Sequence, residues 1–347
     1  MTTLAAAAAV ALSFAAPDDD PTTAVVRATG VPESSDAGIT LHLLHNNRTG
    51  PAMFGKTIPT DTGLEFRPAV KLSRGANYRA VLHLPNADPI TIDYKVPALD
   101  APAPKLVKVF PTAKKLPANL LKFHLYFDQP MREGRAIFDQ IHIEDHTGKR
   151  VHAPWRRQER WSDDARHLIL LIHPGRIKRG VNLREELGPV LLPDQKYTLL
   201  VDANVTSAAG KPIGQETRYP FLTSPEDHER PLPENWTLSI PAAGTRDPLR
   251  IESPEPLDHL LIPTHMAILD SNESPLAVDT KIEDGEQSWL LTPAKPWSAS
   301  PHYLVVDDTL EDLAGNTPQR IFDNDLTLPE PAPGARSIPF TPPPIKH

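Results

Sequence analysis

The stretch His302-Tyr303-Leu304-Val305-Val306-Asp307-Asp308, followed by Leu313-Ala314-Gly315-Asn316, is repeated upstream in the chain. Lys196-Tyr197-Thr198-Leu199-Leu200-Val201-Asp202 leads in the same way to Ala209-Gly210-Lys211-Pro212, and a weaker copy begins at Asn77-Tyr78. In each copy a tyrosine opens a short apolar run of β-strand character, and a small-residue turn follows in the two stronger copies. The repeat therefore predicts three β-modules, and it indicates architecture more than activity.

The composition favours short strands joined by stiff turns. With 347 residues, 39% of them hydrophobic, the chain can fold into two or three domains with buried cores. Its 40 prolines against 17 glycines disfavour a helical protein, because proline is excluded from helix interiors and central strands. Short strands separated by turn signals are typical of antiparallel β-sandwiches. The sequence thus predicts an all-β fold of two to three sandwich modules in tandem.

The charge and the cysteine count exclude several classes of function. The net charge of −8 is spread along the chain and supports solubility, and no basic domain indicates a nucleic-acid partner. The absence of cysteine excludes disulfides, thiolate metal sites, a cysteine nucleophile and a lipid-modified cysteine.

An apolar run from Leu4 to Ala16 has about the length of a signal-peptide core and ends in small residues before Pro17. No lysine or arginine precedes the run, which departs from the usual cationic start. The run is too short to span a bilayer, and no transmembrane segment is expected in the mature chain. We expect a signal peptide over residues 1–16 and export to the periplasm, the cell surface or the medium. An exported chain without cysteine points to a bacterial cell envelope.

Strand and turn signals divide the chain into modules. Residues 17–100 are predicted to form an N-terminal β-sandwich, residues 101–225 a second sandwich and residues 226–329 a third, whose last strand begins at Arg320-Ile321-Phe322. Residues 330–347 are rich in proline and are expected to form an extended, exposed tail. The repeated tyrosine has two interpretations, a strand-end corner in which its hydroxyl bonds the backbone and an ordinary core aromatic.

Several motifs resemble those of a known family. The order Phe127-Asp128-Gln129-Pro130-Met131, Trp161-Ser162-Asp163-Asp164, Tyr197-Thr198-Leu199-Leu200-Val201 and Ala209-Gly210-Lys211-Pro212 resembles the bacterial Ig-like domain of the surface-layer-protein type. The resemblance covers the second module well, the third fairly and the first poorly, since the first lacks both the strand-end motif and the small-residue turn. It implies tandem Ig-like sandwiches that serve as spacers, adhesive modules or cell-surface modules and that need no cofactor.

Two segments of the second module stand apart from the repeat. The tyrosine follows Pro68, Pro174 and Pro293 at spacings of 10, 23 and 10 residues, so the second module carries an insertion within residues 175–189. Long loops on rigid sandwiches often bind ligands, and a loop that packs on its own sandwich is the alternative. In residues 155–161, two tryptophans flank a segment with three arginines. This composition suits sugar stacking or anion binding, and the alternative is that the tryptophans are core residues. The candidate binding surface consists of Trp155, Arg156, Arg157, Arg160, Arg176, Lys178, Arg179 and Arg184.

Sequence patterns indicate no metal, cofactor or catalytic site. Asp307, Asp308, Asp312 and Asn316 offer oxygen ligands for calcium, but turn chemistry explains them equally well. The 14 histidines lack the spacing of a metal site and are expected mostly on solvated strand faces. A nucleophile elbow, a phosphate-binding glycine loop and a zinc-protease helix motif are all missing, so an enzyme is not expected.

The predicted function is that of a non-catalytic exported protein of tandem Ig-like modules, with a structural, adhesive or spacer role at the bacterial cell envelope. The alternative is a binding module that holds a polysaccharide or an envelope protein through residues 155–161 and the insertion. A hydrolase would need carboxylates, or a histidine and a serine, brought together in a cleft from separate segments.

Overall fold

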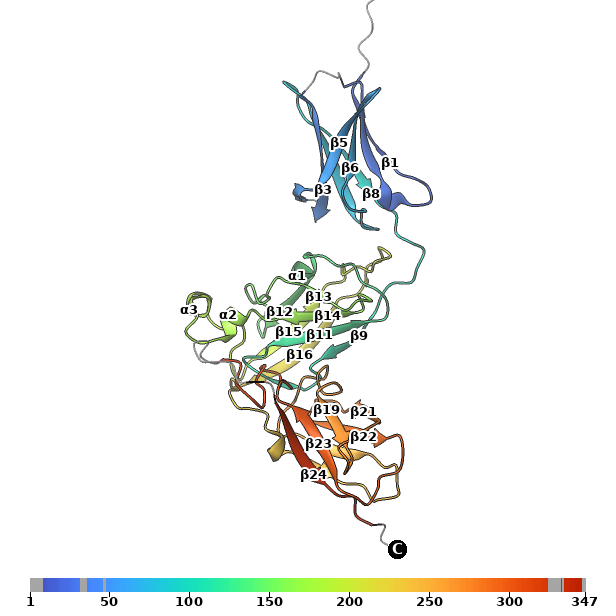
Figure 1. Cartoon of the computed structure of the whole chain (residues 1–347). Coiled ribbons are helices and arrows are strands. Elements are labelled where there is room, and N and C mark those ends of the chain that lie inside the picture. Colours follow the sequence, from blue (N-terminus) through green and yellow to red (C-terminus); the bar gives the residue numbers. More distant parts are fainter. Residues whose placement is uncertain (1–8, 32–35, 46–47, 324–331, 333, 345–347) are drawn as a thin grey trace, which may run out of the picture. The chain divides into compact units, whose positions relative to one another are not determined.

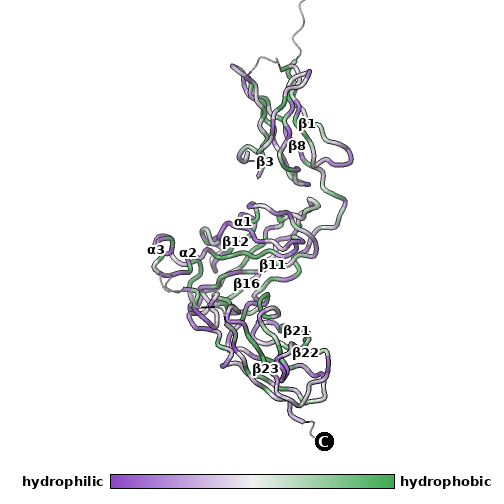
Figure 2. Tube along the Cα trace, viewed as in Figure 1, coloured by the Kyte–Doolittle hydropathy of each residue, from purple (hydrophilic) through white to green (hydrophobic). Residues whose placement is uncertain are grey.

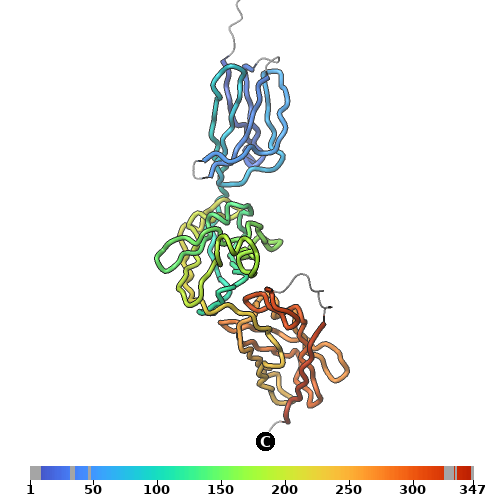
Figure 3. The backbone as a smooth tube through the Cα atoms, turned by 90° about the vertical axis from the view of Figure 1, so that its left-hand side faces the viewer, coloured from blue at the N-terminus to red at the C-terminus, as the bar shows by residue number. Residues whose placement is uncertain are grey.

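The computed structural model describes residues 9–31, 36–45, 48–323, 332 and 334–344. Its described residues divide into two compact units. The first unit spans Met1–Lys105, Gln129–Glu133 and Asn204–Gly214, and the second spans Leu106–Asp128, Gly134–Ala203 and Gln215–His347. The described strands form six four-stranded sheets that pair into three sandwiches (Figure 1), which confirms the predicted all-β fold. Figure 3 shows that each sandwich is built mainly from one continuous stretch of the chain.

The first sandwich lies in the first unit around an apolar core. In β7 (Asn77–His83) the side chains of Tyr78, Ala80 and Leu82 are buried and those between them are more exposed, as strand alternation requires. Its sheets have the orders β1-β2-β6-β5 and β4-β3-β7-β8. The other elements are β1 (Ala11–Ala15), the 3-10 turn η1 (Pro21–Thr23), β2 (Val25–Thr29), β3 (Gly38–His45), β4 (Arg48–Ala52), β5 (Gly55–Thr60), β6 (Gly63–Pro68) and β8 (Ile90–Lys95).

The strand β1 occupies part of the predicted signal peptide. It pairs antiparallel with β2 over all of its length. Leu12 and Phe14 pack against the core of the first sandwich, and the ring of Phe14 stacks on Tyr94 with 4.7 Å between centroids. Cleavage near Ala15 or Ala16 would therefore remove an edge strand of this sandwich, because the alternating apolar residues that suggest a signal core also suit a strand. Residues 1–8 of the predicted signal peptide lie outside the described residues.

The second sandwich lies in the second unit and has the sheet orders β10-β16-β15-β12 and β13-β14-β11-β9. All pairings are antiparallel except that of β10 with β16, which is parallel. Among the described residues no helix has the length and apolar character needed to cross a membrane. The elements are β9 (Leu106–Phe110), β10 (Lys115–Pro117), β11 (Lys122–Phe127), α1 (Ile137–Gln140), β12 (Ile141–Asp145), β13 (Arg160–Trp161), β14 (His167–Leu171), α2 (Pro174–Ile177), α3 (Asn182–Leu187), β15 (Lys196–Val201) and β16 (Thr217–Ser224).

The third sandwich also belongs to the second unit, with the sheet orders β17-β18-β22-β21 and β20-β19-β23-β24. Hydrophobic residues run along its sheets and those of the second sandwich, whereas the turns are largely hydrophilic (Figure 2). The elements are the 3-10 turn η2 (Pro233–Asn235), β17 (Thr237–Ser239), β18 (Leu249–Glu252), β19 (Met266–Leu269), β20 (Pro275–Leu276), β21 (Val278–Ile282), β22 (Ser288–Pro293), β23 (His302–Asp307) and β24 (Ala335–Phe340).

The last strand corrects two predictions about the C-terminal part of the chain. The prediction of an exposed tail over residues 330–347 is wrong for β24, which pairs with β23 along its whole length and buries Phe340 in the core of the third sandwich; residues 330, 331, 333 and 345–347 lie outside the described residues. Residues 320–322, which were expected to begin the last strand, are not in a strand. The proline content misleads here because β24 is an edge strand, where Pro339 is tolerated.

We expect Ile338→Ala to lower the free energy of unfolding of the second unit by about 1–2 kcal/mol, because Ile338 is a partly buried residue that packs against the third core. Ser337→Ala, at the neighbouring exposed position, is the control and is expected to change it by less than about 0.5 kcal/mol. Urea denaturation of the full chain measures both. Equal effects of the two substitutions would contradict the placement of this strand.

The tyrosine corner is confirmed in the first two sandwiches. The hydroxyl oxygen of Tyr78 accepts a hydrogen bond from the backbone N–H of Ser73 at 2.8 Å. Tyr197 accepts one from the N–H of Leu192, again five residues upstream, at 3.0 Å. Both rings are buried, so each tyrosine is a core aromatic whose hydroxyl also satisfies a loop donor.

The third sandwich departs from the predicted repeat by one residue. His302, and not Tyr303, takes the buried position at the start of β23. The His302 ring stacks on Phe340 and lies edge-on to Trp297. The sequence alignment of the three tyrosines is thus wrong for Tyr303, because residues that alternate in a strand exchange faces when the register moves by one position.

We expect Tyr197→Phe to cost about 1–2 kcal/mol of stability, because it leaves the Leu192 N–H without its hydrogen-bond acceptor. Tyr303→Phe is the matched control, since it removes the same hydroxyl from the same strand-opening motif at a position where the described residues form no corner bond, and we expect less than about 0.5 kcal/mol. Thermal or urea unfolding of the two variants gives the comparison. A larger effect at Tyr303 would contradict the corner assignment.

Candidate functional site

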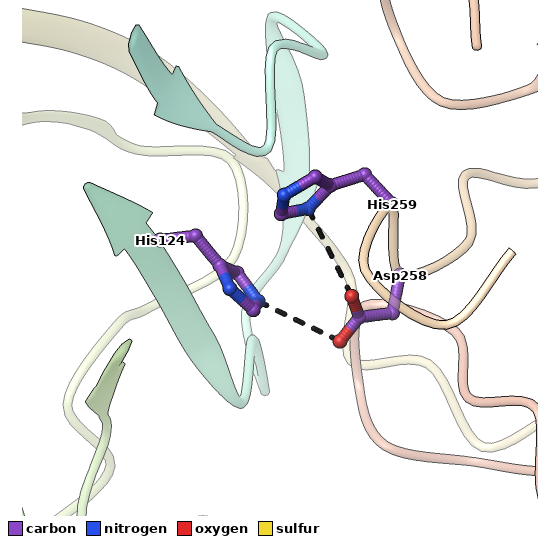
Figure 4. Close-up of side chains that lie close together, drawn as sticks. All are labelled: His124, Asp258 and His259. Carbon is purple, nitrogen blue, oxygen red and sulfur yellow. Dashed lines mark ion pairs between the residues drawn. The ribbon is translucent and has the colours of Figure 1, made fainter. Parts of the chain in front are cut away.

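The candidate site lies on the outer face of β11 in the second sandwich. Side chains alternate along this strand, so Phe123, Leu125 and Phe127 enter the core of the second sandwich. Lys122, His124 and Tyr126 therefore share the opposite face, and the cross-strand pairing of Tyr126 with His167 places His167 on that face too. A turn of the third sandwich that carries Asp258 and His259 covers it (Figure 4).

Asp258 is the centre of the site. Only 2% of its side chain is exposed, and its Oδ2 lies 2.5 Å from the Nζ of Lys122. The same ammonium group pairs with Glu311 at 2.6 Å. Burial by itself would raise the pKa of Asp258, but the neighbouring His124 and the charge of Lys122 outweigh it and hold this pKa well below its usual range. Asp258 is thus an ionised carboxylate whose counter-ion comes from the other sandwich.

Imidazole and phenol rings surround this carboxylate. The Nε2 of His124 lies 3.6 Å from Oδ2 of Asp258, and the Nδ1 of His259 lies 3.8 Å from Oδ1 (Figure 4). On their far sides, Nδ1 of His124 is 3.0 Å from Nε2 of His167, and Nε2 of His259 is 2.8 Å from the hydroxyl of Tyr126. His259 also stacks on Phe110, with 3.7 Å between the ring centroids.

Burial keeps most of these rings neutral. It lowers the pKa of His259 to about 3 and that of His167 to about 4. It raises the pKa of Tyr126 to about 12. The expectation that most histidines lie on solvated strand faces is wrong for this site, since His124 is 3% and His259 is 9% exposed. The outer face of β11 looks polar in the sequence, and only the docking of the third sandwich buries it.

Further hydrogen bonds join the sandwiches next to the site. The carboxylate of Glu286 accepts hydrogen bonds from the backbone N–H of Thr112 at 2.9 Å and from its hydroxyl at 2.5 Å. The Thr112 hydroxyl in turn accepts one from the N–H of Gly285 at 2.7 Å. The backbone N–H of Leu121 donates to the carbonyl of Leu313 at 2.9 Å. The junction therefore combines side-chain and main-chain bonds.

A second cluster, Asp227, Glu255 and Asp312, holds three carboxyl groups with donor atoms within 4.8 Å of one another. Burial, assisted by Asp227, raises the pKa of Glu255 to about 9 and that of Asp312 to about 8. The carboxyl group of Asp312 accepts hydrogen bonds from the N–H groups of Ala314 and Asn316 at 2.7 and 2.9 Å. Turn chemistry thus accounts for this part of the repeat without a calcium ion.

The remaining acidic turn residues also have protein partners. Asp307 accepts hydrogen bonds from the N–H and the hydroxyl of Thr309 at 2.8 and 2.6 Å. Asp308 pairs with Arg336 at 2.8 Å. These contacts favour the turn interpretation of the acidic residues over the calcium interpretation.

The space beside Asp258 is a small cavity of about 10 Å³. A cavity of this size holds about one water-sized particle, so no organic substrate fits there. Two imidazoles and a carboxylate are nevertheless donors that a metal ion accepts. The cavity is lined by Pro111, Lys122, His124, Leu257, Asp258, His259, Glu286, Asp312 and Leu313.

The insertion in the second module packs on its own sandwich. Arg176 is 4% exposed, and its guanidinium donates to the carbonyls of Gly188 and Pro189, both at 2.9 Å, and to that of His152. Arg184 donates to the carbonyl of Ile177 and pairs with Glu226. These two arginines therefore hold α2, α3 and the loop together and are not free for a ligand.

The other members of the predicted binding surface are divided between core and solvent. Trp155 is 4% exposed, and its indole N–H donates to the carbonyl of Ile141 at 2.7 Å, so it is a core residue. Two exposed arginines pair locally, Arg157 with Asp139 at 2.8 Å and Arg179 with Asp323 at 2.9 Å. Lys178 lies 4.8 Å from the ring of Phe322, and Arg156 and Arg160 are exposed.

Sequence reasoning missed the junction residues. The alternation of Lys122, His124 and Tyr126 is visible in the sequence, but it is equally typical of a strand face in water. Asp258 and His259 lie in a turn of the third module, and the contact between Tyr126 and His259 joins residues 133 positions apart. No local pattern predicts that these two segments meet.

Comparison with known proteins shows only distant structural likeness. No protein-family model and no curated protein matches the chain. The FN1–FN3 domains of chicken CNTN1 align with 96% of this chain and 97% of that chain, at 9% identity and a TM-score of 0.21. Extracellular domains 3–5 of Drosophila OTK align with 92% and 90%, at 10% identity and a TM-score of 0.19. The LD transpeptidase LdtMt1, in complex with imipenem, aligns with 52% and 62%, at 12% identity and a TM-score of 0.21.

At these TM-scores the alignments carry no argument about fold or activity, so the assignment depends on the sheets themselves. Each sandwich pairs two four-stranded sheets around an apolar core, and the first two contain a tyrosine corner. The chain is an all-β tandem of Ig-like β-sandwich modules.

Proposed function

We propose that the chain is a non-catalytic structural protein, a spacer or adhesive array of Ig-like modules, in which the second and third sandwiches act as one rigid element. The observation that carries this proposal is the buried ion pair between Lys122 and Asp258 at their junction. Export and a location at a bacterial cell envelope are part of the proposal, and the cysteine-free composition supports them.

Buried charge pairs favour a single orientation of two modules. The side chain of Asp258 is 2% exposed and that of Lys122 is 15% exposed. If the two sandwiches move apart slightly, the carboxylate of Asp258 loses its ammonium partner before water can reach it. Breaking such a pair by removing one partner costs about 3–5 kcal/mol. Interfaces between domains of one chain allow relative motion by default, and a buried ion pair of this kind opposes that motion.

The small-residue turns contribute to assembly in both compact units. In the second unit, Gly315 has φ +83°, and a Cβ atom there would lie 2.6 Å from Cδ2 of Leu121. In the first unit, Gly210 has φ +86°, and a Cβ atom there would lie 2.7 Å from the carbonyl carbon of Arg74. Both turns need glycine for the backbone conformation and for the close approach. The repeated turn therefore supports packing between segments and needs no ligand.

The rigidity can be measured as a distance distribution. Because the natural chain contains no cysteine, the exposed residues Glu186 and Ser271 can be replaced by cysteine and labelled with spin labels in the full chain. Pulsed electron paramagnetic resonance is expected to show a single narrow distribution of distances between the spin labels on the second and third sandwiches. Lys122→Met is expected to broaden it, because Asp258 then loses its ammonium partner.

The matched control is Lys281→Met, which makes the same change at an exposed position of the third sandwich. It is expected to leave the distribution unchanged. A broad distribution in the parent chain would overturn the proposal of a rigid element, and so would equal broadening by the two substitutions.

A binding role remains the second candidate, supported by the exposure of Arg156 and Arg160 on the second sandwich. Guanidinium groups in water suit an acidic polysaccharide or an acidic protein surface. A glycan array with the parent chain and with Arg156→Ala/Arg160→Ala tests it. Binding that both proteins retain equally, or that neither shows, would remove this candidate.

A further inference from the structure

We propose that His124, Asp258 and His259 bind one divalent transition-metal ion of the Zn²⁺ class at the junction of the second and third sandwiches. Each of the three side chains offers a donor atom within 4.8 Å of the other two. The nitrogen-to-oxygen distances to Asp258 are 3.6 Å from His124 and 3.8 Å from His259 (Figure 4). Zinc bonds of about 2.0–2.2 Å place tetrahedral ligands about 3.3 Å apart. Small inward movements of the three side chains therefore complete a three-ligand site.

The far sides of both imidazoles are already held by the protein. Nδ1 of His124 forms a hydrogen bond with Nε2 of His167, and Nε2 of His259 forms one with the hydroxyl of Tyr126. This leaves Nε2 of His124 and Nδ1 of His259 as the nitrogens nearest the carboxylate of Asp258. Metal-binding histidines almost always have such an outer partner, which orients the ring and fixes its tautomer. His167 and Tyr126 are thus the positioning residues of the site.

The donor set and the cavity decide the class of ligand. Imidazole nitrogens suit Zn²⁺, Co²⁺, Ni²⁺ and Cu²⁺, whereas Ca²⁺ and Mg²⁺ prefer sites made of oxygen. The cavity of about 10 Å³ admits an ion with at most one small further ligand. The ligands come from β11 and from the turn after β18, so a bound ion links the two sandwiches directly.

Lys122 is the internal competitor of the metal ion. Its ammonium group lies 2.5 Å from Oδ2 of Asp258 and 2.6 Å from the carboxylate of Glu311. Metal binding requires this positive charge to shift toward Glu311, because two cations repel at such short range. Removing the charge is therefore expected to strengthen metal binding, which is a result that a misfolded variant does not produce.

The test is a titration of the untagged full chain, freed of metal by a chelator, with Co²⁺ alone and then with Zn²⁺ in competition. The intensity of the visible absorption of Co²⁺ indicates whether the bound ion has a low coordination number, and calorimetry gives the number of ions bound per chain. We expect one Co²⁺ per chain with such a spectrum, displaced by Zn²⁺. His259→Gln and His124→Gln are each expected to weaken binding at least about tenfold, since each removes one of three ligands. His146→Gln, at an exposed histidine of the same unit, is the matched control and is expected to bind like the parent chain.

Lys122→Met provides the decisive second variant, with an expected gain in Co²⁺ affinity of about tenfold from the removed charge. The proposal is overturned if the parent chain shows no stoichiometric Co²⁺ site, if His146→Gln weakens binding as much as His259→Gln, or if Lys122→Met fails to strengthen it. The spin-label distances of the metal-free chain test the spacer proposal separately, since they are measured without Co²⁺ or Zn²⁺.

Discussion

Replacing Asp258 with alanine is expected to lower the free energy of unfolding of the second compact unit by about 3–5 kcal/mol. The substitution removes the carboxylate that is 2.5 Å from the ammonium of Lys122 and leaves that group with Glu311 alone. It also leaves His124 and His259 facing an empty space in the junction. Urea denaturation followed by tryptophan fluorescence measures the loss, because all five tryptophans belong to the second unit.

Two further variants sharpen this expectation. Arg250→Ala breaks two ion pairs on the surface of the third sandwich, with Glu252 at 2.9 Å and with Glu283 at 2.6 Å, and it is expected to cost less than about 1 kcal/mol. Lys122→Met combined with Asp258→Leu is expected to recover most of the loss, since apolar side chains of similar size often replace a buried ion pair without net cost. If Asp258→Ala costs no more than Arg250→Ala, the junction does not stabilise the unit in the way described.

Raising the pH from 7 to 9 is expected to destabilise the second unit by about 3 kcal/mol. Burial raises the pKa of Asp312 to about 8 and that of Glu255 to about 9 in the folded protein. Both return to about 4 on unfolding, so the stability that their protons provide is complete below about pH 4 and is lost as the pH passes through 8 and 9. The buried His259 and His167 do not contribute in this window, because burial lowers their pKa values to about 3 and about 4 in the folded protein and an unfolded histidine is mostly neutral above pH 7.

The substitution Glu255→Gln tests the origin of this effect, because glutamine resembles the protonated acid and does not titrate. We expect it to flatten the dependence of unfolding free energy on pH between 7 and 9 by about half. Glu186→Gln, at an exposed position of α3, is the control and should keep the slope of the parent chain. A parent chain whose stability rises over this range would contradict the assignment of raised pKa values to the cluster.

Much of the fold follows from local patterns in the sequence. Alternation around Tyr78 and Tyr197 predicts strands that the structure contains, and the hydrogen bonds that their hydroxyl groups accept from backbone N–H groups confirm the corner interpretation. The same reasoning fails in β23, where two registers of alternation that differ by one residue both fit the sequence. His302 and not Tyr303 enters the core of the third sandwich. It also fails at β24, where proline content suggests a tail although Phe340 completes the core.

The sequence by itself determined the all-β fold and many of the strands and turns, because alternation and turn chemistry act between residues that are close along the chain. The sequence also predicted the insertion in the second module. It did not predict that Arg176 is buried there and donates hydrogen bonds to backbone carbonyls. Only the tertiary structure decided the junction. Lys122 and His124 are an ordinary polar strand face until Asp258 covers them, and the meeting of such distant segments depends on how two finished sandwiches pack.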